Sequence, residues 1–204
     1  MGTNPGHHIE LARDVPLGWL SVWIAAALAA ALMVATGAPE TTGYIWIGDS
    51  RTVGMERVCH MSDPENHIYT IAKSGMGYRW LVTEAEKEIG EIRKTDDAVT
   101  NWEYIVNLGV NDPANVNKYI DWVGDIEDAT VHYVSVNPVP GKALNRKITA
   151  FNDTIKPRVE EFIDTNVYLS FLGYDAPDGL HYSERTYRDI FEYVCDDIGM
   201  AVGE

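Results

Sequence analysis

Only two cysteines, Cys59 and Cys195, occur among the 204 residues. Two cysteines are too few for a disulfide framework, and their spacing does not match that of a metal-binding motif. No other motif in the chain requires a metal or an organic cofactor, so we expect neither. Buried free thiols are the ordinary state of such residues, although one disulfide could persist in an exported protein.

Basic residues are also scarce. The chain has 16 lysines and arginines against 31 aspartates and glutamates, which gives a formal net charge of −15. A surface of this sign repels phosphate backbones and anionic lipid headgroups, so nucleic acid is excluded as an expected partner. Solubility alone is a sufficient reason for the acidity.

Charge is absent from residues 15 to 39, and Leu17 to Ala38 reads LGWLSVWIAAALAAALMVATGA. About 20 apolar residues suffice for a helix to cross a bilayer. A buried core helix is the alternative, but such a helix normally carries a polar stripe. We expect residues 1–16 to form a tail, 17–38 a membrane anchor or a signal with a cleavage site after Ala38, and 43–204 a domain outside the cytoplasm.

Beyond Gly43 the sequence alternates between strand and helix patterns without a repeat or a second domain. Strands are predicted at 44–47, 67–72, 102–109, 130–136 and 166–170, and helices at 50–59, 78–94, 114–126, 145–163 and 183–199. This order predicts a five-stranded parallel sheet in a flavodoxin-like, three-layer α/β/α sandwich, preceded by the N-terminal hydrophobic helix. With strand order 2-1-3-4-5, the first and last helices are neighbours, which predicts a Cys59–Cys195 disulfide.

Chemically capable side chains follow these strands, at the edge of the sheet where parallel α/β proteins place their sites. A serine hydroxyl needs a base to remove its proton, and Ser50 and His181 both lie at this edge. Asp178, three residues before His181, could orient the imidazole. The other acids at the edge are Asp49, Asp112 and Asp175.

A tetrahedral intermediate of acyl transfer also needs hydrogen-bond donors for its oxyanion. The backbone N–H of Ser50, a glycine N–H from the segment KSGMG and the side-chain amide of Asn111 are the candidates. Each residue alone is weak evidence, since Gly-Asp-Ser and Asn-Asp are common turn sequences. Their order along successive strand ends is the informative feature.

Four segments resemble the conserved blocks of the SGNH (GDSL-like) hydrolases. They are IGDSR with Ser50, AKSGMG with Gly75, LGVND with Asn111, and PDGLHY with Asp178 and His181. The resemblance implies that Ser50 is the nucleophile and that Ser50, Gly75 and Asn111 form the oxyanion hole, with Gly77 as the alternative glycine. The family often has leucine where this chain has Arg51, which would either touch substrate or cover the first helix.

The sequence therefore predicts a serine esterase that hydrolyses small acyl esters, acetyl esters of carbohydrates in particular. An acyltransferase with the same residues is an alternative that the sequence does not separate from it. A non-catalytic ligand-binding module would not need the Ser50, His181 and Asp178 set. A flavodoxin-like nucleotide binder would need a phosphate-binding glycine-rich loop after the first strand, which this chain lacks. The sequence gives no indication of the oligomeric state.

Overall fold

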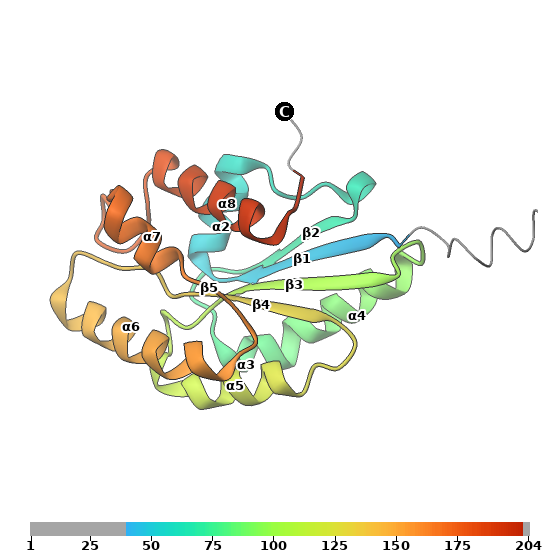
Figure 1. Cartoon of the computed structure of the whole chain (residues 1–204), viewed down its shortest axis with the longest axis horizontal. Coiled ribbons are helices and arrows are strands. Elements are labelled where there is room, and N and C mark those ends of the chain that lie inside the picture. The colour runs from blue at the N-terminus through green and yellow to red at the C-terminus, as the bar shows by residue number, and fades with distance from the viewer. Residues whose placement is uncertain (1–39, 202–204) are drawn as a thin grey trace, which may run out of the picture. The chain divides into compact units, whose positions relative to one another are not determined.

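The computed structural model describes residues 40–201 (Figure 1). The predicted tail and the hydrophobic segment at 17–38 lie outside these residues. Within residues 40–201, no helix combines the length and the apolar character needed to cross a membrane.

Five strands alternate with helices along the chain. The strands are β1 (Thr42–Gly48), β2 (Ile68–Ala72), β3 (Asn101–Asn107), β4 (Thr130–Val134) and β5 (Glu161–Ile163). The helices are α2 (Ser50–Cys59), α3 (Tyr78–Trp80), α4 (Glu86–Thr95), α5 (Val116–Gly124), α6 (Lys142–Ile155), α7 (Thr165–Leu172) and α8 (Glu184–Ile198). A π-helical turn, Leu81–Ala85, joins α3 to α4, and short 3₁₀ turns occur at Pro64–Asn66, Pro113–Asn115 and Lys156–Arg158.

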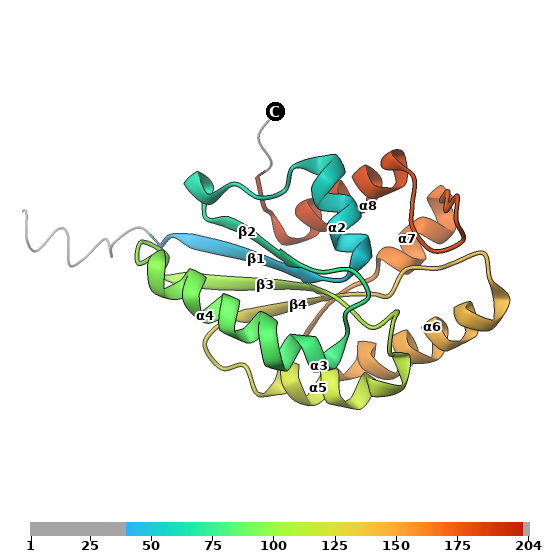
Figure 2. The ribbon, with the colours of Figure 1, turned by 180° about the vertical axis from the view of Figure 1, so that it is seen from behind.

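All five strands are parallel and lie in the order β2-β1-β3-β4-β5, as predicted. Helices α2, α7 and α8 cover one face of the sheet, and α3, α4, α5 and α6 cover the other (Figures 1 and 2). The carboxyl ends of the strands therefore lie together at one edge, between the two helical layers.

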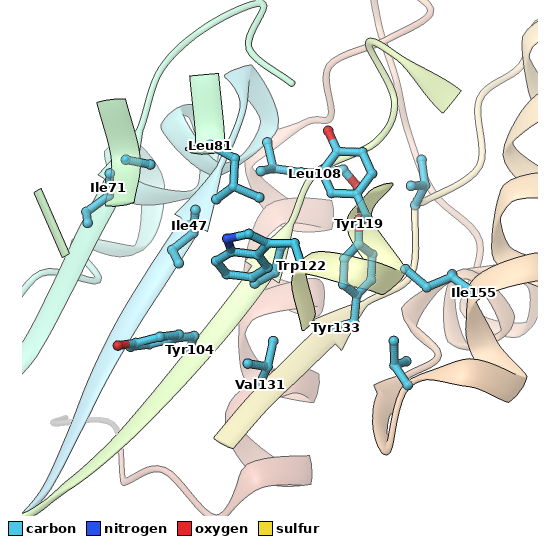
Figure 3. Packing of buried hydrophobic residues seen from close by; sticks show 14 of the residues in the cluster. Ile47, Ile71, Leu81, Tyr104, Leu108, Tyr119, Trp122, Val131, Tyr133 and Ile155 are labelled. Atoms are coloured by element: carbon cyan, nitrogen blue, oxygen red, sulfur yellow. Dashed lines mark hydrogen bonds between the residues drawn. The ribbon is translucent and has the colours of Figure 1, made fainter. Parts of the chain in front are cut away.

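The core consists of two hydrophobic clusters, one on each face of the sheet. Successive side chains of β1 alternate between them: Ile45 and Ile47 belong to the cluster under α4, α5 and α6, and Trp46 belongs to the cluster under α2 and α8. Figure 3 shows the first cluster, in which Tyr119 and Trp122 of α5 pack over residues of the sheet. Burial on both faces explains why the strands read as continuous apolar runs.

The prediction for the fifth strand is wrong. Residues 166–170 lie in α7, and the strand is the preceding three-residue β5 at the edge of the sheet. Asp164 caps α7 by accepting a hydrogen bond from the backbone N–H of Val167 at 3.1 Å. Thr165 and Leu169, four residues apart, are the buried residues of α7, which is helical spacing. The cap and this burial outweigh the strand propensity of the segment.

The predicted helix at 145–163 is also shorter than expected. Helix α6 begins at Lys142 and ends at Ile155, and Pro157 lies in the 3₁₀ turn that follows it. Proline has no N–H to donate to the helical hydrogen bond, so the α-helix stops here. At α8 the prediction is confirmed, with Ser183 as the N-cap.

The predicted disulfide is not formed: Cys59 and Cys195 are both free. Their helices, α2 and α8, are neighbours as predicted, and both side chains belong to or pack against the same hydrophobic cluster. Burial raises the pKa of the Cys59 thiol to about 11 and that of Cys195 to about 12. Because the thiolate is the reactive form, we expect both thiols to react slowly at neutral pH.

Candidate active site

The turn between β1 and α2 places Ser50 at the edge of the sheet. Asp49 is the N-cap of α2, and its Oδ1 accepts a hydrogen bond from the backbone N–H of Arg51 at 2.9 Å. A Cβ atom on Gly48 would lie 1.8 Å from Thr52 Oγ1, so only glycine fits this close approach of strand and helix. Ser50 is consequently the first residue of α2, where the positive end of the helix dipole and free backbone N–H groups lie.

His181 reaches Ser50 from the loop between α7 and α8. Its Nε2 lies 2.8 Å from Ser50 Oγ, and its Nδ1 lies 2.7 Å from Asp178 Oδ2. Asp178 Oδ1 also accepts the backbone N–H groups of Leu180 and His181, at 2.9 and 2.7 Å. A hydroxyl, an imidazole and a carboxylate are thus joined in one continuous chain of hydrogen bonds.

The electrostatics of Asp178 suit an orienting carboxylate. The hydrogen bond from the His181 side chain, followed by the two backbone hydrogen bonds, holds the pKa of Asp178 well below its usual range. The carboxylate therefore stays charged at neutral pH and favours the Nδ1–H tautomer of His181, which leaves Nε2 free to accept the proton of Ser50.

The other three acids at this edge have different contacts. Asp175 uses its backbone to bond Thr186 and Ser183. Asp112 accepts hydrogen bonds from the Tyr78 backbone N–H and the Tyr119 hydroxyl, at 2.9 and 2.8 Å. Asp49 is 1% exposed, and burial raises its pKa to about 6 against the opposing effects of the Arg51 N–H and guanidinium.

Asn111 lies between the turn that carries Asp49 and the loop after β2. Its Nδ2 donates to the carbonyl oxygen of Met76 at 2.8 Å and to Asp49 Oδ2 at 3.3 Å. Asn111 therefore bonds the chain neighbours of two candidate residues: Asp49 precedes Ser50, and Met76 follows Gly75. The structure brings the predicted oxyanion segments to the same edge, and the Asn111 amide is bonded to protein acceptors.

Positions 75 and 77, the two candidates for the oxyanion glycine, favour glycine for different reasons. Gly75 has a φ of +76°, in the left-handed region, and a Cβ there would meet no atom within 4 Å. At Gly77 a Cβ would lie 2.5 Å from the Asp112 carboxyl group. Gly75 is thus constrained by its backbone and Gly77 by packing, and neither constraint alone identifies an oxyanion donor.

A pocket of about 340 Å³ opens beside Ser50 and His181. Val53, Gly54 and Arg57 of α2 form one wall, and Tyr182 and Tyr187 contribute aromatic surface. A second pocket, of about 530 Å³, begins at Asn111 and extends along α6 to Lys147 and Phe151. Ser50 thus lines one hollow and Asn111 lines the other.

The sequence alone does not decide the role of Arg51. In the structure its side chain is buried and is 3% exposed. Its Nε and Nη1 donate to the carbonyl oxygens of Leu180 and Asn137, at 3.2 and 3.0 Å. These partners are 129 and 86 residues away in the sequence, so no local pattern reveals them. The local sequence indicates only that a charged residue stands at a position of α2 that is buried.

No protein-family model and no curated protein matches the chain. Solved structures do. A GDSL-like lipase from Bacteroides thetaiotaomicron has a TM-score of 0.59 at 17% identity, over 86% of this chain and 98% of the lipase. A protein described as an SGNH hydrolase from Slackia heliotrinireducens has a TM-score of 0.53 at 11% identity, over 78% of this chain and 100% of that one.

The chain has the fold of the SGNH hydrolases. The same fold occurs in the catalytic domain of a peptidoglycan O-acetyltransferase from Streptococcus pneumoniae, with a TM-score of 0.54 at 16% identity over 79% of this chain and 95% of that domain. At these identities the likeness concerns the fold. In this SGNH fold, the four sequence blocks lie after β1, β2 and β3 and in the loop before α8, all at one edge of the sheet.

Proposed function

We propose that this protein is a serine esterase in which Ser50 is the nucleophile, His181 the general base and Asp178 the orienting acid. The observation that carries the proposal is the hydrogen-bonded chain from Ser50 Oγ through His181 to Asp178, with both links shorter than 3 Å. A serine at a helix N-terminus, bonded to an imidazole that is itself bonded to a carboxylate, is the arrangement that activates a hydroxyl.

In the first half-reaction, Ser50 Oγ attacks the ester carbonyl carbon while His181 Nε2 takes the hydroxyl proton. The bond to the alcohol oxygen then breaks, His181 returns the proton to the leaving alcohol, and the acyl group remains on Ser50. In the second half-reaction, water attacks the acyl group by the same steps, and the carboxylic acid is released from Ser50. Asp178 stays ionised throughout and stabilises the imidazolium.

The oxyanion receives hydrogen bonds from the Ser50 N–H, the Asn111 amide and Gly75, the glycine favoured by the sequence. Asn111 Nδ2 already bonds Met76 and, at the longer distance of 3.3 Å, Asp49. The oxyanion takes the place of the Asp49 contact, which is the weaker of the two. Such donors act where negative charge develops and typically contribute on the order of 3 kcal/mol each.

The proposed substrates are small acyl esters, acetyl esters of carbohydrates in particular. In this proposal the pocket beside Ser50 receives the acyl group, and the hollow lined by Asn111 offers room for the alcohol part. Acyl transfer to a sugar hydroxyl is the alternative, since it uses the same acyl-enzyme and one structural neighbour is an O-acetyltransferase domain. We further propose that residues 17–38 anchor this domain outside the cytoplasm.

Ser50→Ala tests the proposal. We expect kcat for p-nitrophenyl acetate to fall about 10⁴- to 10⁶-fold, with the fold unchanged. A fluorophosphonate should label Ser50 in the original protein and nothing in the variant. Ser170→Ala is the matched control, because Ser170 is an exposed serine whose hydroxyl donates to the backbone carbonyl of Asn166 in its own helix.

Retained hydrolysis in Ser50→Ala, or labelling of another serine, would refute the assignment. A series of esters with increasing acyl length then defines the acyl group. Acetylated glycans, supplied with and without a sugar acceptor, separate hydrolysis from transfer: an esterase releases acetate at the same rate in both, whereas a transferase forms the acetylated acceptor.

A further inference from the structure

Arg51 contacts both chain neighbours of His181. Its Nε donates to the carbonyl oxygen of Leu180 at 3.2 Å, and its guanidinium carbon lies 5.0 Å from the centre of the Tyr182 ring. Leu180 and Tyr182 are the residues immediately before and after His181. One side chain, attached next to Ser50, therefore holds the loop on both sides of the imidazole.

The same guanidinium also reaches a third segment. Nη1 donates to the carbonyl oxygen of Asn137, in the loop after β4, at 3.0 Å. The Tyr182 hydroxyl donates to the carbonyl oxygen of Pro138, the next residue, at 2.5 Å. The start of α2, the loop after β4 and the His181 loop are thus joined around Arg51.

The burial of the Arg51 charge has an unfavourable free energy. Arg51 is 3% exposed, its hydrogen-bond acceptors are two neutral carbonyls, and its Nη2 has no hydrogen-bond partner among residues 40–201. The Asp49 carboxylate interacts favourably with the guanidinium but does not accept a hydrogen bond from it. Burying a charge that donates only to neutral carbonyls costs several kcal/mol, which an apolar side chain of similar size would avoid. Stability alone therefore does not explain an arginine at this position, whereas its directional contacts with Leu180 and Tyr182 do.

We propose that Arg51 is a positioning residue that sets the distance and angle between His181 Nε2 and Ser50 Oγ. The inference rests on the proposed function, because it assigns Arg51 a role in that reaction. The loop from Gly173 to Ser183 is irregular, and the side chains of Asp178 and His181 within it are 58% and 40% exposed. Without the contacts to Leu180 and Tyr182, His181 would keep its bond to Asp178 but lose its fixed approach to Ser50.

The test compares Arg51→Met with Arg51→Lys. Methionine fills the space without charge, so the free energy of unfolding should be unchanged or higher. We expect kcat for p-nitrophenyl acetate to fall about 100-fold, the usual effect of a displacement near 1 Å, with KM changed less than about threefold. Lysine cannot bond Leu180 and Asn137 in the same planar geometry, so Arg51→Lys should give an intermediate kcat. Arg188→Met is the control, since Arg188 is an exposed arginine of α8 outside the pocket.

A merely structural Arg51 predicts the opposite pattern, with stability and kcat falling together in Arg51→Met. That result, or a kcat within about threefold of the original, would overturn the proposal. Should Arg51→Met not fold, Arg51→Lys decides: an unchanged kcat overturns the proposal and a reduced one supports it. The proton NMR signals of the His181 ring provide a readout independent of turnover. They should shift in both Arg51 variants and not in Arg188→Met, even if Ser50→Ala shows that the protein is not an esterase; unshifted signals would refute the positioning role.

Discussion

At the scale of single residues, the aspartates around His181 differ in what their carboxylates bond. Asp178 Oδ2 lies 2.7 Å from His181 Nδ1, whereas the contacts of Asp175 run through its backbone. Asp178→Asn would present an amide to Nδ1 and stabilise the wrong imidazole tautomer. We expect kcat/KM to fall about 10⁴-fold, as in other triads, with the fold intact. Asp175→Asn is the matched control and should stay within about threefold; if it is the crippled variant, the orienting acid is Asp175.

Asp49 predicts a pH effect on stability. Its pKa is raised from 3.8 to about 6 by burial. Between these values the folded state binds a proton that the unfolded state releases, so the contribution of Asp49 to stability is present below pH 4 and lost as the pH rises to 6. In Asp49→Asn the side chain does not ionise, so the variant does not lose this stability as the pH rises. Relative to the original protein, its free energy of unfolding should therefore rise by on the order of 3 kcal/mol between pH 4 and pH 7.

Urea denaturation at several pH values measures this difference. Asp97→Asn, at an exposed position before β3, is the control and should show no such rise. A flat difference for Asp49→Asn would mean that Asp49 is not charged and buried at neutral pH. The expected gain in stability would accompany a loss of activity, because Asp49 also bonds the Asn111 amide.

At the scale of elements, the loop after β2 is held by the helix start after β3. Gly77 leaves room for the Asp112 carboxyl group, which bonds the Tyr78 N–H, and Asn111 bonds the Met76 carbonyl. A methyl group at Gly77 would overlap Asp112 at 2.5 Å and push this loop away from Asn111. We expect Gly77→Ala to cost about 1–3 kcal/mol in stability and to lower kcat/KM at least tenfold.

Gly90→Ala, in the interior of α4, is the control for this prediction. A Cβ there meets no atom within 4 Å, so the change should stabilise the helix by about 1 kcal/mol and leave kcat/KM unchanged. If Gly77→Ala keeps full stability and activity, Asp112 moves freely and does not fix the loop.

The elements also show what the sequence can and cannot predict. Strands β1 to β4 were predicted because both faces are buried, which makes them continuous apolar runs bounded by polar turns. The edge strand β5 has three residues and no such pattern, and α7 was mistaken for it because its helical state depends on the Asp164 cap. Ser50, Asp178 and His181 could be named because their chemistry stands out locally. The role of Arg51 could not, since it depends on carbonyl groups from two distant loops.

At the scale of the whole molecule, hydrogen bonds hold the first described residues against the sheet. Thr41 accepts the backbone N–H groups of Thr100 and Asn101 and donates to Thr100 Oγ1. These bonds fix the entry of the chain into β1. A chain that starts at Pro39 retains all of them, whereas one that starts at Tyr44 also loses the first two residues of β1. The first should fold as stably as the full chain, and the second should be less stable.

The same truncation tests the proposed anchor. Leu17 to Ala38 is apolar throughout and long enough to span a bilayer, so the full chain should sediment with membranes and resist extraction by alkaline carbonate. The chain that starts at Pro39 should remain in the supernatant with the same kcat/KM for p-nitrophenyl acetate, because every residue of the proposed site lies beyond Gly48. The masses of the protein in the membrane and soluble fractions show whether cleavage after Ala38 occurs, since a cleaved chain would lose the segment and leave the membrane. A full chain that is monomeric in solution without detergent would contradict the anchor, and the hydrophobic segment would then have to be buried against protein.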